Sequence, residues 1–460
     1  MAIVGAFALP HPPLIIPAVG CGRERAIDAT IRSMEEVSRR VAALSPDTVV
    51  ISSPHTAIYR DYFHVSPGAG AKGSFAGFGA PQAAYAVLYD QQFTSALSRE
   101  ADALGLSCGC DYERDPRLDH ATMIAVHFAC AHIPDVPIVR IGFSGLGVRE
   151  HYRVGRLIQK VSDDLGRRVV YIASGDLSHK LKEDGPYGFM PEGPVFDERV
   201  CRDFASADLA DLLAIEPSLA ERAAECGLRS FQMMVGALDH MAVTGELMSY
   251  EGPYGVGYGV AAFEVKGPSD EDRLAGYNEV RAARLAATKD AEDPYVRLAR
   301  LSLESYVRDG VRITVPEGLP ADLTSRRAGC FVSLKIDGNL RGCIGTIAPT
   351  QSTLAAEIVA NAISAGTRDP RFSPVRSAEL ADIVYDVDVL GEPEPATVGA
   401  LDPKRYGVIV SSHGRRGLLL PDLDGVDTVE EQLRIAAQKG GIDLDFDDYW
   451  IDRFEVVRHL

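Results

Sequence analysis

The stretch ALPHPPLIIP, residues 8–17, continues an apolar run that begins with AIVGAF at residues 2–7. A short unbroken run of apolar residues predicts a buried β-strand. Prolines at positions 12, 13 and 17 restrict the backbone that follows it. His11 is therefore expected at the end of a strand, on a stiffened backbone that lowers the entropy cost of holding its ring in one place.

Three further runs have the same apolar, β-branched character: DTVVISS at 47–53, VPIVRIGF at 136–143 and RVVYIAS at 168–174. Amphipathic segments of helical length lie near residues 24–44, 90–104 and 148–165. Strands that alternate with helices predict an α/β domain over residues 1–266, with a central, substantially parallel sheet and helices on both of its faces.

The second half of the chain has a different pattern. Residues 267–295 are polar, charged and rich in alanine, which is typical of a partly helical linker. Over residues 296–460 the strand-like runs come in adjacent pairs. IDGNL at 336–340 contains the Asp-Gly signal of a tight hairpin, and SSHGRRG at 411–417 places glycine and polar residues between two apolar runs. We therefore expect an α+β domain with mostly antiparallel strands.

Composition narrows the classes of function. The 460 residues are 46% hydrophobic and carry a formal net charge of -18, with no extended Lys/Arg cluster, which disfavours binding to nucleic acid. The N-terminus lacks the basic segment of a signal peptide, and no apolar run reaches membrane-spanning length, so a cytoplasmic protein is expected. The eight cysteines are scattered, and disulfides are not expected. Small molecules and other proteins are therefore the expected kinds of partner.

Histidines follow several of the predicted strands. His11 follows the first, His55 follows the second within SSPH, and His179 follows the 168–174 strand within GDLSHK. Because ligands of open α/β sheets bind outside the carboxyl ends of the strands, these histidines predict one site. Two imidazoles and one anionic ligand suit non-haem Fe(II), and the adjacent Glu225 and Cys226 are both candidates for the anion. Histidines read as structural or solvated are His64, His127, His132, His151 and His240.

The order of these motifs resembles a known family over residues 1 to about 265. HPP, SSPH, LDHATM at 118–123, GDLSH and the ECG-helix together are similar to the catalytic B-type subunit of class III extradiol ring-cleaving dioxygenases and to the related Memo proteins. The resemblance implies that His11 and His55 bind Fe(II), with Glu225 as the carboxylate ligand. It also implies that His120 and His179 form an acid/base pair.

The resemblance leaves the third ligand open. The dioxygenases use a carboxylate at this position, whereas Memo proteins have a cysteine in a similar ICG stretch, and ECG at 225–227 contains both. A thiolate favours softer metals, so that zinc becomes an alternative to Fe(II). Glu225 and Cys226 both remain candidates.

The dioxygenase resemblance also implies a mechanism that uses O2 and a small catecholic or related aromatic substrate. His179 would accept a phenolic proton, and His120 would stabilise or protonate the oxygenated intermediate. Asp176 could orient the site or a bound water, or simply form a turn. Tyr59, on the loop that carries His55, is the expected substrate contact.

The motif NLRGCIGT at 339–346 resembles the hallmark of the AMMECR-like family, and DPRF (369–372), VDVLGEPEP and GLLLP (417–421) extend the match over about 296–458. Arg341, Gly342, Cys343 and Gly345 carry this motif, and its glycines allow close approach of a backbone or a ligand. Cys343 is a candidate nucleophile if Arg341 or Arg371 lowers its pKa, and is otherwise a packing residue.

A fusion of this kind resembles the AmmeMemoRadiSam group and implies a radical SAM protein as partner, although this chain has no CxxxCxxC motif of its own. Two hypotheses follow: an Fe(II) oxidoreductase of the extradiol dioxygenase type, or a Memo-like metal-binding assembly protein without ring cleavage. A zinc hydrolase is a third, and a homodimer is the expected assembly.

Overall fold

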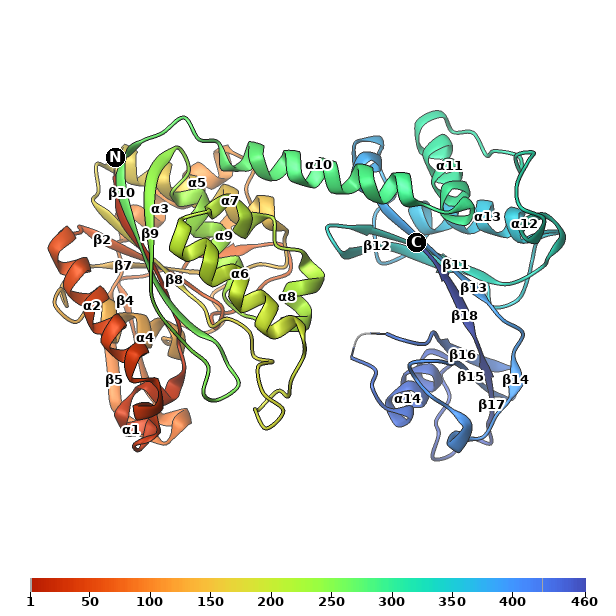
Figure 1. Cartoon of the computed structure of the whole chain (residues 1–460), viewed down its shortest axis with the longest axis horizontal. Helices are drawn as coiled ribbons and strands as arrows, with labels where there is room; N and C mark the ends of the chain where they lie inside the picture. Colours follow the sequence, from red (N-terminus) through yellow and green to blue (C-terminus); the bar gives the residue numbers. More distant parts are fainter. Residues whose placement is uncertain (1, 424) are drawn as a thin grey trace. The chain divides into compact units, whose positions relative to one another are not determined.

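The computed structural model describes residues 2–423 and 425–460 (Figure 1). The chain forms two compact units, Met1–Arg281 and Ala282–Leu460. Helix α10 (Arg273–Ala291) crosses the boundary between them. The segment 267–295, expected as a linker, thus consists of the end of strand β10 (Tyr258–Pro268), helix α10 and the start of helix α11 (Pro294–Asp309).

A six-stranded sheet forms the centre of the N-terminal unit, in the order β7-β2-β8-β1-β10-β9. The four strands expected from sequence are its parallel part: β1 (Ile3–Leu9), β2 (Thr48–Ser53), β7 (Ile138–Gly142) and β8 (Val169–Ser174). β10 and β9 (Met241–Glu251) extend the sheet as an antiparallel hairpin. The predicted α/β class is confirmed.

Helices cover both faces of this sheet, and each face has its own apolar core (Figure 1). One core lies beneath α2 (Asp28–Leu44) and α4 (His120–Ala129). The other lies beneath α3 (Gln91–Ala103), α5 (Val148–Leu165), α6 (Glu192–Ser206) and α9 (Leu228–Ala237). The parallel strands are buried on both sides, which explains their continuous apolar sequences.

Glycines bring α5 and α9 into close contact. A Cβ added at Gly155 would lie 2.0 Å from the carbonyl oxygen of Met233, and one added at Gly236 would lie 2.0 Å from that of Tyr152. The two backbones therefore approach as closely as glycine allows. This packing sets the position of α9, whose N-terminus follows Cys226.

Shorter elements complete the N-terminal unit. They include the hairpin β4–β5, the β3–β6 pair and several short helices. Their bounds are α1 Pro17–Gly20, β3 Phe63–His64, β4 Gly70–Phe75, β5 Ala80–Leu88, β6 Cys108–Gly109, α7 Leu209–Leu213 and α8 Pro217–Ala223, with 3-10 turns at Pro13–Ile15, Arg23–Ile27 and Ala76–Phe78.

The C-terminal unit has two antiparallel four-stranded sheets, in the orders β12-β11-β13-β18 and β14-β17-β15-β16, which confirms the expected α+β class. The strands are β11 Cys330–Ile336, β12 Asn339–Gly345, β13 Val384–Leu390, β14 Glu394–Pro395, β15 Gly407–Ser412, β16 Arg415–Leu419, β17 Trp450–Phe454 and β18 Val456–His459. The helices besides α11 are α12 Ala321–Ser325, α13 Leu354–Thr367 and α14 Val429–Lys439, with 3-10 turns at Ser377–Asp382 and Val398–Ala400.

The expected hairpin joins β11 to β12. Its two turn residues, Asp337 and Gly338, have φ angles of 50° and 78°, the left-handed conformations that a two-residue hairpin turn needs. Among the described residues, no helix is both long and apolar enough to cross a membrane.

Candidate metal centre

His11 is held at the carboxyl end of β1 by two contacts. Its side chain is buried, its backbone N–H donates to Asp176 Oδ1 at 2.7 Å, and its Nδ1 lies 3.0 Å from Ser174 Oγ. A proton on Nδ1 can be donated to this hydroxyl, which leaves the lone pair of Nε2 available. Ligating histidines are commonly oriented by such a bond from their other ring nitrogen.

Two donor atoms from distant parts of the chain lie close to His11 Nε2. His55 Nε2 is 3.1 Å away and Cys226 Sγ is 3.5 Å away. A tetrahedral ion bound at about 2.05 Å from nitrogen and about 2.3 Å from sulfur would separate two nitrogens by about 3.3 Å and a nitrogen from a sulfur by about 3.6 Å. The observed separations of 3.1 and 3.5 Å are close to these values, so the three side chains fit a metal.

Glu225 and Cys226, the two candidates for the anionic ligand, point to different places. Glu225 Oε2 accepts the backbone N–H of Leu228 at 2.6 Å, at the start of α9. Burial raises the pKa of Glu225 to about 7. Among the described residues, the two groups whose donor atoms could hold an ion both contain Cys226, and neither contains Glu225. The geometry therefore places the thiol, and not the carboxylate, beside the two histidines.

The second of these groups consists of Asp176, His179 and Cys226, whose donor atoms lie within 4.8 Å of one another. Asp176 is 6% exposed, and burial raises its pKa to about 7. Glycines allow the two loops to meet, since a Cβ added at Gly175 would lie 2.1 Å from Gly227 Cα. The loop after β8 and the loop before α9 are thus in direct backbone contact.

His120 lies against both His55 and His11. Their ring centroids are 4.1 Å apart, and those of His120 and His11 are 5.6 Å apart. His120 is the first residue of α4, where Asp119 accepts the backbone N–H of Thr122 at 2.9 Å. This cap fixes the start of the helix and hence the position of the His120 ring.

Burial lowers the pKa of all four clustered histidines: His11, His55, His120, whose value falls to about 4, and His179. Neighbouring imidazoles lower the pKa further for His11, His120 and His179. The rings are therefore neutral at pH 7, which is the form that binds metals. Burial also raises the pKa of Cys226 well above its ordinary value, an effect that a bound cation would oppose.

Tyr59 is engaged elsewhere. Its hydroxyl donates to the carbonyl of Tyr112, and the guanidinium of Arg114 lies 4.6 Å above its ring. Within the described part of the chain, no hydrogen bond or ring contact joins it to His11, His55, His120 or His179. Its role as a substrate contact stays a prediction.

A cavity of about 250 Å³ lies beside His55. Arg140, a buried residue of β7, lines this cavity and donates to the carbonyl of Arg117, another lining residue, at 2.7 Å and to Ser66 Oγ at 2.7 Å. Sequence reasoning missed Arg140, although a charge within the otherwise apolar run VPIVRIGF was a usable signal. The lining residues are His55, Thr56, Ala57, Gly73, Ser74, Ala76, Gly77, Asp115, Arg117, Leu118, Asp119 and Arg140.

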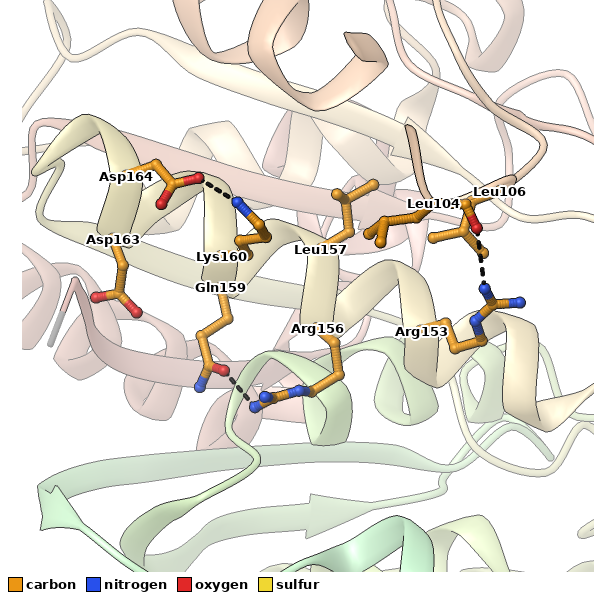
Figure 2. Close-up of a pocket in the computed structure, with 9 residues that line it drawn as sticks. All are labelled: Leu104, Leu106, Arg153, Arg156, Leu157, Gln159, Lys160, Asp163 and Asp164. Atoms are coloured by element: carbon orange, nitrogen blue, oxygen red, sulfur yellow. Dashed lines mark hydrogen bonds and ion pairs between the residues drawn. The ribbon is translucent and has the colours of Figure 1, made fainter. Parts of the chain in front are cut away.

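A second cavity, of about 500 Å³, lies between α5 and the end of α3. Figure 2 shows the residues that line it. Leu104, Leu106 and Leu157 line it together with charged residues, among which Lys160 Nζ pairs with Asp164 Oδ2 at 2.5 Å. No histidine or cysteine lines this cavity, so the larger cavity does not contain the candidate metal ligands.

The hallmark of the C-terminal unit lies on β12. A Cβ added at Gly342 would lie 2.3 Å from the carbonyl oxygen of Ala365, and one at Gly345 would lie 2.3 Å from the Phe331 ring, so both glycines serve internal packing. Burial raises the pKa of Cys343, which Arg371 only partly offsets. Arg371 is paired with Asp369 at 2.7 Å.

Arg341, the other cation expected to activate Cys343, is paired with Glu379 at 2.7 Å. Neither arginine therefore gives the thiol a lowered pKa, and the described surroundings of Cys343 are those of a protonated packing residue.

The N-terminal unit is thus an α/β protein in which two histidines and a cysteine thiol, at the carboxyl edge of a parallel sheet, lie close enough to hold a metal ion. Comparison with known proteins agrees with this class. Residues 5–261 match the family described as the catalytic LigB subunit of aromatic ring-opening dioxygenase, and residues 296–459 match the AMMECR1 family. The chain belongs to the LigB family and carries an AMMECR1 domain at its C-terminus.

One relative matches the whole chain, and two other proteins match about a third of it. The protein CA_C1420 of Clostridium acetobutylicum is 40% identical over 100% of this chain and 99% of its own length. A protein of Thermotoga maritima is 58% identical over 36% of this chain and 98% of its own length. Among solved structures, protein PH0010 of Pyrococcus horikoshii is 31% identical, covers 36% of this chain and 88% of its own, and gives a TM-score of 0.34. The expected fusion of the two domains is confirmed.

Proposed function

We propose that the N-terminal unit is a non-haem Fe(II) oxidoreductase of the extradiol ring-opening dioxygenase type, acting in the cytoplasm on a small catecholic or related aromatic and O2. The observation that carries the proposal is the convergence of His11 Nε2, His55 Nε2 and Cys226 Sγ at the spacing of metal ligands, in a chain of the LigB family. When bound, iron would polarise the substrate oxygens and supply redox chemistry.

The protein's own groups would handle protons and orientation. Burial lowers the pKa of His179, so that its ring is neutral at pH 7 and can accept a phenolic proton. His120 is neutral too, and its place beside His55 and His11 suits it to hold or deliver a proton next to the two histidine ligands. Asp176 fixes the backbone of His11. Tyr59 would reach a substrate only after releasing the carbonyl of Tyr112.

The test is oxygen uptake by protein loaded with Fe(II) under anaerobic conditions and then mixed with a panel of catechols and aminophenols. We expect turnover in the wild type and a loss of about 10²- to 10⁴-fold in His179→Ala, the range typical of a general base. His132→Ala, at an exposed position, is the control. Iron-loaded wild type that consumes no oxygen with any of these substrates would refute the proposal.

The placement of Cys226 favours a second candidate, a Memo-like metal-binding assembly protein that works with a radical SAM partner and cleaves no ring. A thiolate ligand suits zinc or Cu(I) as well as iron. Metal content after purification without oxygen should fall in Cys226→Ala and persist in Glu225→Ala. A stable complex with the partner, together with absent turnover, would favour this candidate over the first.

A further inference from the structure

Cys226 belongs to two groups of potential ligands, not one. His11 and His55 form the first group with it, and Asp176 and His179 form the second. Three loops thus approach the same sulfur: those after β1, β2 and β8. Thiolate sulfur has several lone pairs, and can therefore bind two ions at once.

The second group has unused bonding capacity of its own. His179 Nδ1 is buried and makes no well-formed hydrogen bond among the described residues, although the backbone of Ala224 lies near the ring and buried polar atoms normally have a partner. Asp176 is 6% exposed, and its Oδ1 accepts the His11 backbone N–H while its Oδ2 lies 3.9 Å from His11 Nε2. Buried carboxylates are normally paired or bound to a metal.

We propose that Asp176, His179 and Cys226 form a second site for a divalent metal ion, so that the centre holds two ions bridged by the Cys226 thiolate. The donor atoms of this second group all lie within 4.8 Å of one another, whereas two ligands of a tetrahedral ion are about 3.3–3.6 Å apart. Small side-chain rotations would close the group on an ion. A carboxylate, an imidazole and a thiolate suit Zn(II), Co(II) and Fe(II).

The second ion would regulate the proposed reaction. This consequence rests on the proposed function, in which His179 accepts a proton from the substrate. A nitrogen that holds an ion cannot accept that proton, so turnover should rise with the first equivalent of metal and fall with the second. The second site would then limit activity when metal is abundant.

The test is an anaerobic titration of the metal-free full chain with Co(II), followed by cobalt–thiolate absorption and by metal analysis after gel filtration. We expect two equivalents in the wild type, one in His179→Ala, one in His55→Ala and none in Cys226→Ala. His132→Ala, an exposed control, should keep two. One equivalent in the wild type, or two in His179→Ala, would overturn the proposal.

This measurement uses neither oxygen nor substrate, so its result is separate from that of the oxygen-uptake assay. Two equivalents without turnover would support the second site while refuting the oxygenase. One equivalent with turnover would do the reverse. Asp176→Asn is a supporting variant, expected to bind one equivalent, because asparagine retains an oxygen for the His11 backbone N–H but loses the negative charge.

Discussion

Replacing Gly175 by alanine tests whether contact between the two ligand loops sets the metal site. The new Cβ would lie 2.1 Å from Gly227 Cα, whereas ordinary contact begins at 3.4 Å, so the loops must separate by the difference, about 1.3 Å. Metal sites tolerate deviations of about 0.2 Å in ligand distance. Cys226 follows the displaced loop away from His11, and we expect metal affinity to fall at least about tenfold to 100-fold, as when residues that orient ligands are changed.

The same substitution should cost about 1–3 kcal/mol of stability, as overpacking does elsewhere. Calorimetry should therefore show the melting temperature of the N-terminal unit lowered by about 2–4 °C for each kcal/mol. Gly267→Ala is the matched control, because a Cβ there meets no atom within 4 Å. If Gly175→Ala bound metal within twofold of the wild type and melted at the same temperature, the loops would not be rigidly coupled and the reasoning would fail.

Three further predictions concern packing and buried charge. Gly155→Ala should lower the unfolding free energy by about 1–3 kcal/mol in chemical denaturation, because its Cβ would meet the Met233 carbonyl at 2.0 Å; an unchanged midpoint would contradict the packing of α5 on α9. Burial raises the pKa of Asp197 to about 7, above its unfolded value of about 3.9, so its protonated form stabilises the fold at low pH and this contribution is lost as pH rises from about 4 to 7. The difference in melting temperature between the wild type and Asp197→Asn should therefore become smaller as the pH rises from about 4 to 7. A difference that stays constant or grows would exclude a raised pKa of Asp197. In the C-terminal unit, Glu357 is fully buried and accepts four bonds from Thr346, Thr350 and Gln351, so Glu357→Gln should cost about 1–3 kcal/mol by calorimetry while the exposed Glu430→Gln costs little.

Sequence alone was sufficient for the parallel strands, because β1, β2, β7 and β8 are uninterrupted apolar runs whose length and β-branched content leave few alternatives. The convergence of His11, His55 and His179 also followed from topology, since each is connected to the carboxyl end of a parallel strand. That rule places residues near one edge of a sheet without fixing where a side chain points.

Sequence alone could not decide whether Glu225 or Cys226 is the third ligand, because it does not fix the direction of either side chain. The two residues are adjacent, and their directions depend on how the chain enters α9, where the carboxylate accepts a helix N–H and turns away from the histidines. The environment of Cys343 could not be predicted from the sequence either. Its neighbouring arginines were visible in the sequence, but their pairing with Glu379 and Asp369 was not.

The approach of Cys226 to His11 joins positions 215 residues apart in the chain. An ion held between them would act as a cross-link that closes a very long loop, and would restrict the unfolded chain far more than a local contact does. Because β1 lies between β8 and β10 in the sheet, His11 reaches its final place only after those later strands have been synthesised. Metal loading would thus come at the end of folding, and metal retention would report that the whole N-terminal unit has assembled.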